Sequence, residues 1–268
     1  MALFEKRWLV NRRDALKTAI AAGAAMATAA GCDSATATTS GTPAAQPAGA
    51  GTASKAGAPT ASASPFTALP PEVSNGPRDR PNVALTFHGQ GEPALVDRLL
   101  SELETGGARA TVLAVGSWLA AQPAMARRIL DGGHELGNHT QHHVAIAQLS
   151  AAGAYREINE CATVLRRLTG SAGVWFRPSQ TRHATATIRA EARRAGYLTC
   201  LSYDVDSRDY TDPPPAVVVR DTLASLRNGS IVSMHCGHRT TIDALGPILD
   251  TLRTRGLRAV TMTQLVSG

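Results

Sequence analysis

Residues 82–91, NVALTFHGQG, decide the fold of this chain. They join a short apolar run, which reads as one buried strand, to a polar end that contains two glycines. From residue 82 onward, short apolar runs of this kind alternate with longer amphipathic runs. Such alternation is typical of strands that are linked by helices around a parallel sheet.

Short runs predict strands, and the longer runs between them predict helices. The predicted strands are 83–87, 110–115, 135–138, 174–177, 197–205, 230–235 and 259–262. The predicted helices are 93–105, 121–130, 152–168, 185–195, 216–227 and 242–255. About seven strand–helix units predict an α/β barrel or a barrel-like sheet, a fold whose chemistry gathers at the C-terminal ends of the strands.

The first 79 residues are predicted to lie outside this domain. Arg12 and Arg13 precede an uncharged, Ala-rich run, and the pattern predicts a twin-arginine signal peptide over residues 1–32. The run ends in AAGC at 29–32, which is similar to a lipoprotein processing box and predicts a lipid anchor at Cys32; an ordinary signal peptide is the alternative. Residues 33–79 are almost only Ala, Thr, Ser, Gly and Pro, which predicts a disordered linker before a single domain at 80–268.

The net charge of +6 does not indicate nucleic-acid binding. Residues 1–32 hold five basic and two acidic side chains, a net of +3, so only +3 remains for the rest of the chain. The arginines of the folded part fall in amphipathic patterns, and aromatic residues make up only 4% of the chain. We therefore expect solvated helix faces and no nucleic-acid partner.

Three cysteines follow Cys32: Cys161, Cys200 and Cys236. None has the CxxC spacing of a metal or redox site. Cys200 and Cys236 lie on or beside predicted strands and could pair. The sequence leaves open whether they are buried thiols or one disulfide.

Candidate chemistry lies just after the predicted strands. His139 and His143 follow the third strand, and on a helical turn their i, i+4 spacing would place both imidazoles on one side, close enough for one divalent ion. Other predicted strand ends carry His88, Arg177, Asp206 and His235.

With these residues in this order, the chain resembles the polysaccharide deacetylases, the family-four carbohydrate esterases that share the nodulation-factor deacetylase (NodB) homology domain. The resemblance runs from about residue 81 to 265 and rests on five separated motifs. It implies a distorted (β/α)7 barrel and a divalent metal, expected to be Zn²⁺. It also implies that His139 and His143 are metal ligands and that His235 is the general acid that protonates the leaving amine.

The resemblance implies roles for four further residues. Asp206 is expected to anchor Arg177, which in turn orients the catalytic base. The backbone N–H of Gln180 is expected to help hold the tetrahedral oxyanion. Tyr210 stands where the family has Trp, and is expected to keep an aromatic wall beside the substrate.

The chain departs from the family at its first motif, Thr-Phe-Asp-Asp-Gly. His88 stands at the position of the base, and Gly89 stands at the position of the third metal ligand. His88 could complete a three-histidine site or serve as the base, but a nitrogen bound to metal cannot accept a proton. Asp204, Asp206 and Glu92 are possible replacement carboxylates, although Asp206 is expected to pair with Arg177.

The leading hypothesis is a metal-dependent hydrolase that removes the N-acetyl group from an amino-sugar polysaccharide such as peptidoglycan or a chitin-like glycan. The alternative is a catalytically degenerate surface lipoprotein that binds glycan in the same groove. Both hypotheses place an exported monomer at the outer face of the cytoplasmic membrane or the cell surface, with a polysaccharide as its partner.

Overall fold

The computed structural model describes residues 69–267. The predicted signal peptide, the lipid anchor at Cys32 and the linker up to residue 68 lie outside the described residues. Within 69–267, no helix has the length and apolar character needed to cross a membrane.

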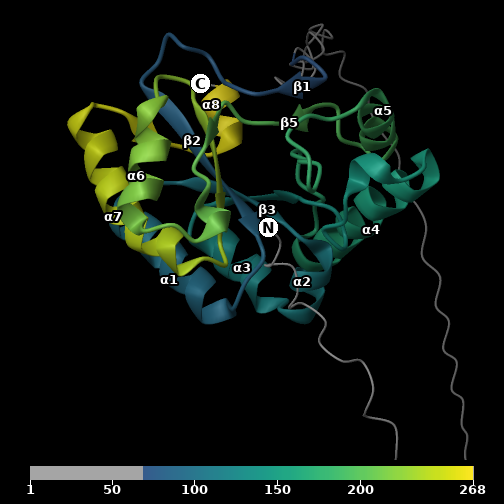
Figure 1. Cartoon of the computed structure of the whole chain (residues 1–268). Coiled ribbons are helices and arrows are strands. Elements are labelled where there is room, and N and C mark those ends of the chain that lie inside the picture. The colour runs from purple at the N-terminus through teal and green to yellow at the C-terminus, as the bar shows by residue number, and fades with distance from the viewer. Residues whose placement is uncertain (1–68, 268) are drawn as a thin grey trace, which may run out of the picture. The chain divides into compact units, whose positions relative to one another are not determined.

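A parallel sheet forms the centre of the domain (Figure 1). In spatial order its strands are β4 (Glu135–Asn138), β3 (Ala110–Ala114), β2 (Asn82–Gly89), β7 (Ile231–His235) and β6 (Val205–Asp206), and β8 (Arg258–Ala259) pairs with the first residues of β2. Because all these ladders are parallel, the C-terminal ends of the strands meet at one edge.

The sheet continues beyond β4 through single contacts. Phe176 forms parallel bridges to Asn138 and to Cys200, and β5 (Cys200–Leu201) pairs with β1 (Glu72–Val73). The strands therefore form a distorted barrel, which confirms the predicted fold class. The predicted strand 174–177 is reduced to the bridge at Phe176, and the predicted strand 197–205 divides into β5 and the start of β6.

The folded domain begins earlier than the sequence predicted. Strand β1 lies within the predicted linker, where Val73 is buried. Glu72 accepts a hydrogen bond of 2.6 Å from the backbone N–H of Ala184, across more than one hundred residues of sequence. Residues 69–79 are thus part of the domain. The segment has few apolar residues, but the buried Val73 and the hydrogen-bonded Glu72 attach it to the rest of the fold.

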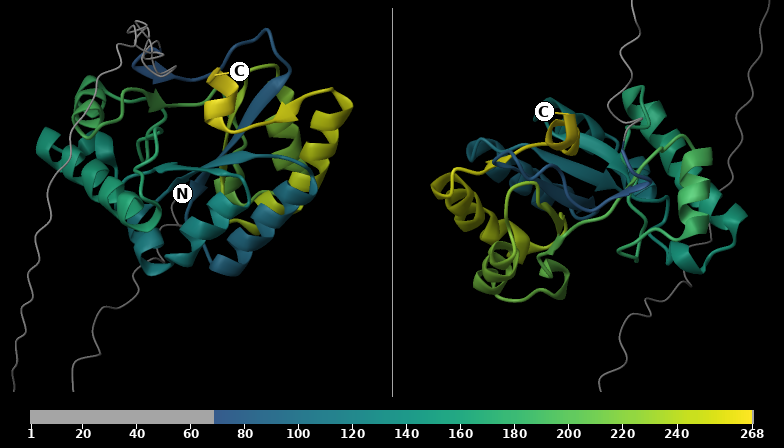
Figure 2. Two further views of the ribbon diagram at one scale, coloured as in Figure 1. Left: turned by 180° about the vertical axis from the view of Figure 1, so that it is seen from behind. Right: turned by 90° about the horizontal axis from the view of Figure 1, so that it is seen from above.

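Helices cover the outside of the strands (Figure 2). They are α1 (Pro93–Thr105), α2 (Gly116–Ala121), α3 (Ala124–Asp131), α4 (Ala151–Thr169), α5 (Ala186–Arg194), α6 (Pro215–Ala224), α7 (Arg239–Thr254) and α8 (Met262–Ser267). Helices α1, α6 and α7 lie on one side, with α4 and α5 on the other (Figure 1). The predicted helix 121–130 is α3 alone, because Pro123 lacks the N–H that would continue α2.

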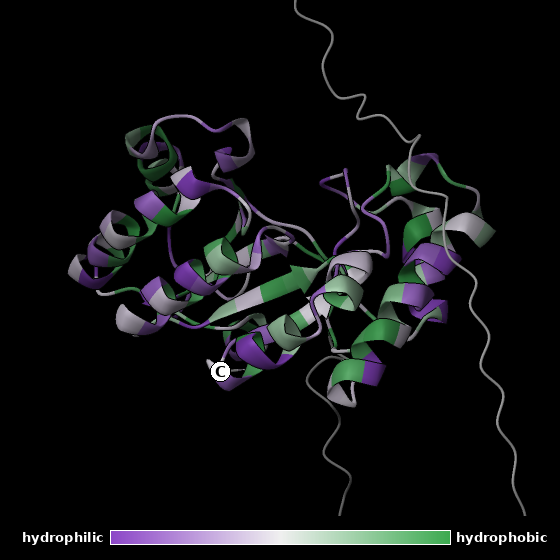
Figure 3. Ribbon diagram, turned by 90° about the horizontal axis from the view of Figure 1, so that it is seen from below, coloured by the Kyte–Doolittle hydropathy of each residue, from purple (hydrophilic) through white to green (hydrophobic). Residues whose placement is uncertain are grey.

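The core surrounds β2, whose residues are buried on both faces except for partial exposure at His88. Burial on both faces is expected of a strand in the middle of a parallel sheet that helices cover. In Figure 3 the central strands are largely green, whereas the surrounding helices alternate between purple and green segments. Cys161, Cys200 and Cys236 are buried free thiols, so the disulfide left open by the sequence is not formed.

Candidate active site

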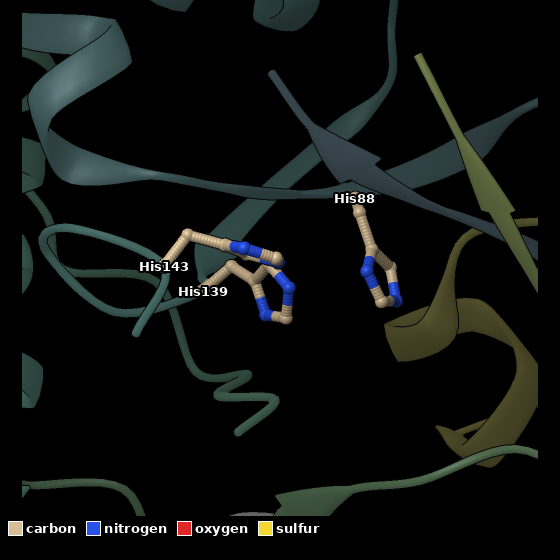
Figure 4. A group of neighbouring side chains, drawn as sticks. All are labelled: His88, His139 and His143. Carbon is tan, nitrogen blue, oxygen red and sulfur yellow. The ribbon is translucent and has the colours of Figure 1, made fainter. Parts of the chain in front are cut away.

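Four histidines from distant parts of the sequence meet at the C-terminal edge of the sheet. His88 is the last residue but one of β2 and His235 is the last residue of β7, and the two are register partners in the ladder between these strands. The ring centroid of His88 lies 4.3 Å from that of His139 and 4.3 Å from that of His235. The rings of His139 and His143 are 4.9 Å apart, and Figure 4 shows His88, His139 and His143 gathered in one place.

His139 and His143 converge through a loop and not through a helical turn, so that part of the expectation is wrong. Thr140 and His143 have φ angles of 67° and 55°, in the left-handed region. The Asn138 side-chain oxygen accepts from the Thr140 N–H at 2.8 Å, and the Thr140 hydroxyl accepts from the His143 N–H at 3.2 Å. These local side-chain bonds stabilise a conformation that a β-branched residue otherwise adopts rarely.

Helix α4 anchors the same loop. The buried carboxylate of Glu157 accepts two hydrogen bonds of 2.8 Å from His142, one from its backbone N–H and one from Nδ1. His142 therefore has a structural role: it ties the loop that carries His139 and His143 to α4. Sequence reasoning missed Glu157, because the position of its carboxylate depends on where α4 packs.

The three imidazoles of His88, His139 and His143 fit a divalent metal. Each offers one ligand atom, and these atoms lie within 4.8 Å of one another. The Nδ1–H of His139 donates to the Arg177 carbonyl at 2.9 Å, which leaves the lone pair on Nε2. That Nε2 and the Nδ1 of His88 are buried without a hydrogen-bond partner, as unbound metal-ligand nitrogens would be.

The imidazoles are electrically neutral at neutral pH. Burial lowers the pKa of His88 well below its usual value, and the neighbouring His139 and His235 lower it further. Burial also lowers the pKa of His139 well below its usual value, and lowers the pKa of His143. Neutral rings keep a lone pair available, which is the form that binds metal.

His235 is held by a residue that the sequence analysis did not single out. Nδ1 of His235 lies 2.7 Å from Oδ1 of Asp209, whose other oxygen accepts from the His235 backbone N–H at 2.7 Å and from the Thr241 hydroxyl at 2.6 Å. Asp209 is fully buried at the start of a short 3-10 helix, η3 (Asp209–Thr211). Burial alone would raise the pKa of Asp209, but the hydrogen bonds from His235 and Thr241 outweigh it, so the pKa is lowered.

Arg177 and Asp206 do not form the expected ion pair. The buried guanidinium of Arg177 donates instead to the carbonyls of Leu201 at 3.3 Å and Ser202 at 3.1 Å. Burial lowers the pKa of Arg177 to about 9. The Asp206 carboxylate accepts from the Arg208 backbone N–H at 3.0 Å. Backbone carbonyls at the end of β5 thus bind the guanidinium in place of the expected carboxylate.

Three of these four histidines line a groove made of two adjoining cavities of about 430 and 460 Å³. Both cavities are lined by His88, His143, Tyr210 and His235. Among the described residues that line either cavity, Asp206 is the one carboxylate. A larger cavity of about 550 Å³ lies around Arg78 and Arg255, but it contains none of these groups and has no evident connection to their chemistry.

Gln180 and Tyr210 also border this groove, as expected. Gln180 has a φ of 54°, and within the described chain its backbone N–H donates to no protein acceptor. Its side-chain amide donates to the His143 carbonyl at 2.7 Å. The Tyr210 ring is half exposed and meets His235 edge-on, with centroids 5.4 Å apart.

The other replacement carboxylates that the sequence suggested lie elsewhere. Asp204 forms an ion pair of 2.7 Å with Arg78 and accepts from the Ile231 N–H, which makes it structural. Glu92 is an exposed residue that precedes α1 and lines neither cavity. Gly89 faces β3, where an added Cβ would lie 2.6 Å from Cγ1 of Val112.

Comparison with known proteins finds relatives of the domain that carries these histidines. The family model described as polysaccharide deacetylase matches residues 75–200. The peptidoglycan-N-acetylmuramic acid deacetylase PdaC of Bacillus subtilis (strain 168) is 28% identical over 198 residues, which cover 74% of this chain and 41% of PdaC. The chain spans 41%, 62% and 42% of the length of the first curated relatives that it matches.

Solved structures agree in fold. The structure described as "T48 deacetylase with substrate" is 31% identical with a TM-score of 0.62, and the match covers 68% of this chain and 89% of that one. BA3943, a CE4 family pseudoenzyme from Bacillus anthracis, has a TM-score of 0.69 at 23% identity, covering 74% and 69% of the two chains, which shows the shared fold. This chain belongs to the polysaccharide deacetylase family.

Proposed function

We propose that this chain is a hydrolase that removes the acetyl group from the nitrogen of an amino sugar in a cell-envelope polysaccharide. The family supports this reaction class, and peptidoglycan is the proposed substrate because relatives such as PdaC are named for it. The observation that carries the proposal is the convergence of three neutral imidazoles with the His235–Asp209 pair in one groove.

His88, His139 and His143 would hold the divalent metal, which we propose to be Zn²⁺. Three nitrogen ligands are typical of hydrolytic zinc sites that keep a position open for water or substrate. A bound ion of this kind supplies a Lewis acid, which polarises the acetyl carbonyl and makes water more acidic. With His88 used as a ligand, the proton of the attacking water needs a different acceptor.

Asp206 is the proposed base, because its carboxylate lines the groove and is not paired with Arg177. Water adds to the acetyl carbon and Asp206 takes its proton; the C–N bond then breaks as His235 gives a proton to the sugar nitrogen. Asp209 holds His235 by Nδ1, so that Nε2 can serve this transfer. The products are acetate and a free amine.

Two groups would position the substrate. The unpaired backbone N–H of Gln180 would donate to the oxygen that becomes negative during attack. The half-exposed ring of Tyr210 would pack against a sugar ring at the rim of the groove.

The predicted export signal suits this substrate. A twin-arginine signal and a lipid anchor at Cys32 would place the domain outside the cytoplasmic membrane, where envelope polysaccharide is found. We propose that it acts there as a monomer.

The test is acetate release by the purified, metal-analysed full chain from N-acetylglucosamine oligomers and from peptidoglycan. We expect near-stoichiometric zinc and measurable acetate, and Asp206→Asn should lower kcat by about 100-fold or more. Asp250→Asn is the matched control: it removes the same charge from an exposed side chain on α7, whose partner is the exposed Arg253, and should leave kcat unchanged. A zinc-loaded wild type that releases no acetate from either substrate contradicts the proposal.

One observation favours the second function, a catalytically degenerate glycan-binding protein. The ligand cluster in the described chain consists of three imidazoles, and both acidic positions of the first motif are occupied by His88 and Gly89. Equal glycan binding by the wild type and by His235→Ala, without turnover in either protein, would support this alternative.

A further inference from the structure

Ser233 contacts His88 on the side away from the other two ligands. Its hydroxyl lies 3.2 Å from Nε2 of His88, and its side chain lines the groove although the residue is only 2% exposed. In the ladder between β2 and β7, Thr86 pairs with Ser233 and His88 with His235. Because side chains two residues apart share a face of a sheet, His88 and Ser233 lie on the same face.

The two nitrogens of His88 therefore have different surroundings. In Figure 4 one ring nitrogen of His88 lies on the side of His139 and His143, and the other lies on the far side. Nε2 contacts the Ser233 hydroxyl, whereas Nδ1 is buried with no protein partner. Nδ1 is thus the atom that could join a metal shared with His139 and His143.

A neutral imidazole carries one proton, and its position decides whether Nδ1 can bind metal. With the proton on Nε2, that N–H donates to the Ser233 oxygen and the Nδ1 lone pair faces the cluster. With the proton on Nδ1, the buried N–H would lack an acceptor, and no lone pair would face the cluster. The Ser233 hydroxyl can accept from Nε2 or donate to it, but only the first form leaves no buried N–H of His88 without an acceptor, so that form is favoured.

A hydrogen bond also fixes the tautomer of His139, but it is made by Nδ1 and not by Nε2. There the Arg177 carbonyl accepts from Nδ1 and leaves Nε2 free. His139 and His88 would thus bind through different nitrogens, because their outer partners lie on different sides of the cluster. Hydrogen-bonded outer partners of this kind usually fix the tautomer of a metal-ligating histidine.

We propose that Ser233 is a positioning residue that holds His88 in the Nε2–H tautomer, so that Nδ1 supplies the third metal-binding nitrogen of this chain. The inference rests on the proposed three-histidine metal site and deepens it. It assigns Ser233 a part in replacing the carboxylate ligand that Gly89 cannot provide.

The first test reads the tautomer directly in the metal-free full chain. The imidazole ¹⁵N resonances of His88, assigned with His88→Gln, should show a protonated Nε2 and an unprotonated Nδ1. Ser233→Ala should give a mixture of tautomers, and Ser233→Thr, which keeps the hydroxyl, should restore the wild-type pattern. Thr86→Val is the matched control, since it removes a buried hydroxyl that donates to the Val232 carbonyl and not to a histidine.

The second test measures zinc affinity by competition with a chromogenic chelator. Ser233→Ala should bind zinc about 10-fold or more weakly than the wild type, while Ser233→Thr and Thr86→Val should stay close to the wild type. A wild type that binds no zinc defeats the proposed metal site. Tight zinc binding by the wild type with unchanged affinity and tautomer in Ser233→Ala overturns the role of Ser233 alone. A wild-type His88 protonated on Nδ1 also overturns it, even if Ser233→Ala fails to fold.

Discussion

Three of the four imidazoles of the candidate site have one ring nitrogen bonded to a protein neighbour. His139 contacts the Arg177 carbonyl, His235 contacts Asp209, and His88 contacts Ser233. Each partner leaves the other nitrogen of its ring without a protein hydrogen bond among the described residues. At the scale of single residues, these outer partners decide which atoms can bind metal or transfer a proton.

Asp209→Asn should weaken both the fold and the proposed reaction. The carboxylate is fully buried and accepts three hydrogen bonds, from His235 twice and from Thr241, and an amide cannot accept all of them. We expect the free energy of unfolding to fall by about 1–3 kcal/mol at pH 7 in urea denaturation. We also expect lower kcat, because His235 loses its fixed orientation.

The stability effect of Asp209 should depend on pH with a definite sign. Its pKa is lowered in the folded state, since the bonds from His235 and Thr241 outweigh burial. Its contribution is therefore complete above the ordinary Asp pKa of about 3.9 and is lost as the pH falls through the lowered folded value. The difference between wild type and Asp209→Asn should be constant from pH 7 to 5 and shrink below about pH 4. A difference that grows on acidification would contradict this account.

At the scale of elements, the strands determine where the groove forms, and the loops determine how its side chains are oriented. The parallel register of β2 and β7 places His88 beside His235. The loop after β4 reverses through two left-handed residues, and its bonds to Asn138 and Glu157 hold it in place. Neither the loop conformation nor its anchors follow the periodicity of a helix or a strand.

Gly89 shows how tightly β2 and β3 pack at this edge. A Cβ at Gly89 would lie 2.6 Å from Cγ1 of Val112 and 3.0 Å from Cα of Ala114. We expect Gly89→Ala to lower the free energy of unfolding by about 1–3 kcal/mol, and Gly89→Asp to lower it further without adding a metal ligand.

A double variant tests the cause of this loss. Val112→Ala removes the atom nearest to the new Cβ, so the combined loss in Gly89→Ala/Val112→Ala should be smaller than the sum of the two single losses. Urea denaturation of the four proteins measures the coupling. Additive losses would show that the new Cβ does not press on Val112. A Gly89→Asp protein with wild-type stability and raised zinc affinity would show that residue 89 points into the groove.

At the scale of the whole domain, the three described cysteines are buried in two hydrophobic clusters of the barrel. Cys161 and Cys236 belong to the large core around β2, whereas Cys200 packs in a second cluster with Ile158 and Phe176. Burial raises the pKa of Cys161 and Cys200 to about 12 and raises that of Cys236 as well. These thiols are therefore protonated and shielded at neutral pH.

We expect Cys161, Cys200 and Cys236 to react with iodoacetamide at pH 8 only after the chain is unfolded. Peptide mass mapping of the native and the urea-unfolded protein, both without reductant, would measure this. All three should be modified in urea. A disulfide-linked peptide that joins Cys200 to Cys236 would contradict the structure.

The amino-acid sequence was enough to predict the parallel α/β barrel and to bring His88, His139, His143 and His235 to one edge of its sheet. Periodic apolar runs reveal strands and helices, and the ends of parallel strands necessarily share one edge. The motif order added the family. These inferences succeed because each depends on the spacing of apolar residues within one segment or on the order of the motifs along the chain.

The tertiary structure alone decided which groups touch. It paired His235 with Asp209 and His88 with Ser233, bonded Arg177 to backbone carbonyls, and left Asp206 facing the groove. It also brought residues 69–79 into the domain through β1. Such contacts join residues tens to more than a hundred positions apart, and they depend on differences of one or two ångströms in packing. Sequence periodicity fixes the face on which a side chain lies, but only the packed barrel sets the distance to its partner.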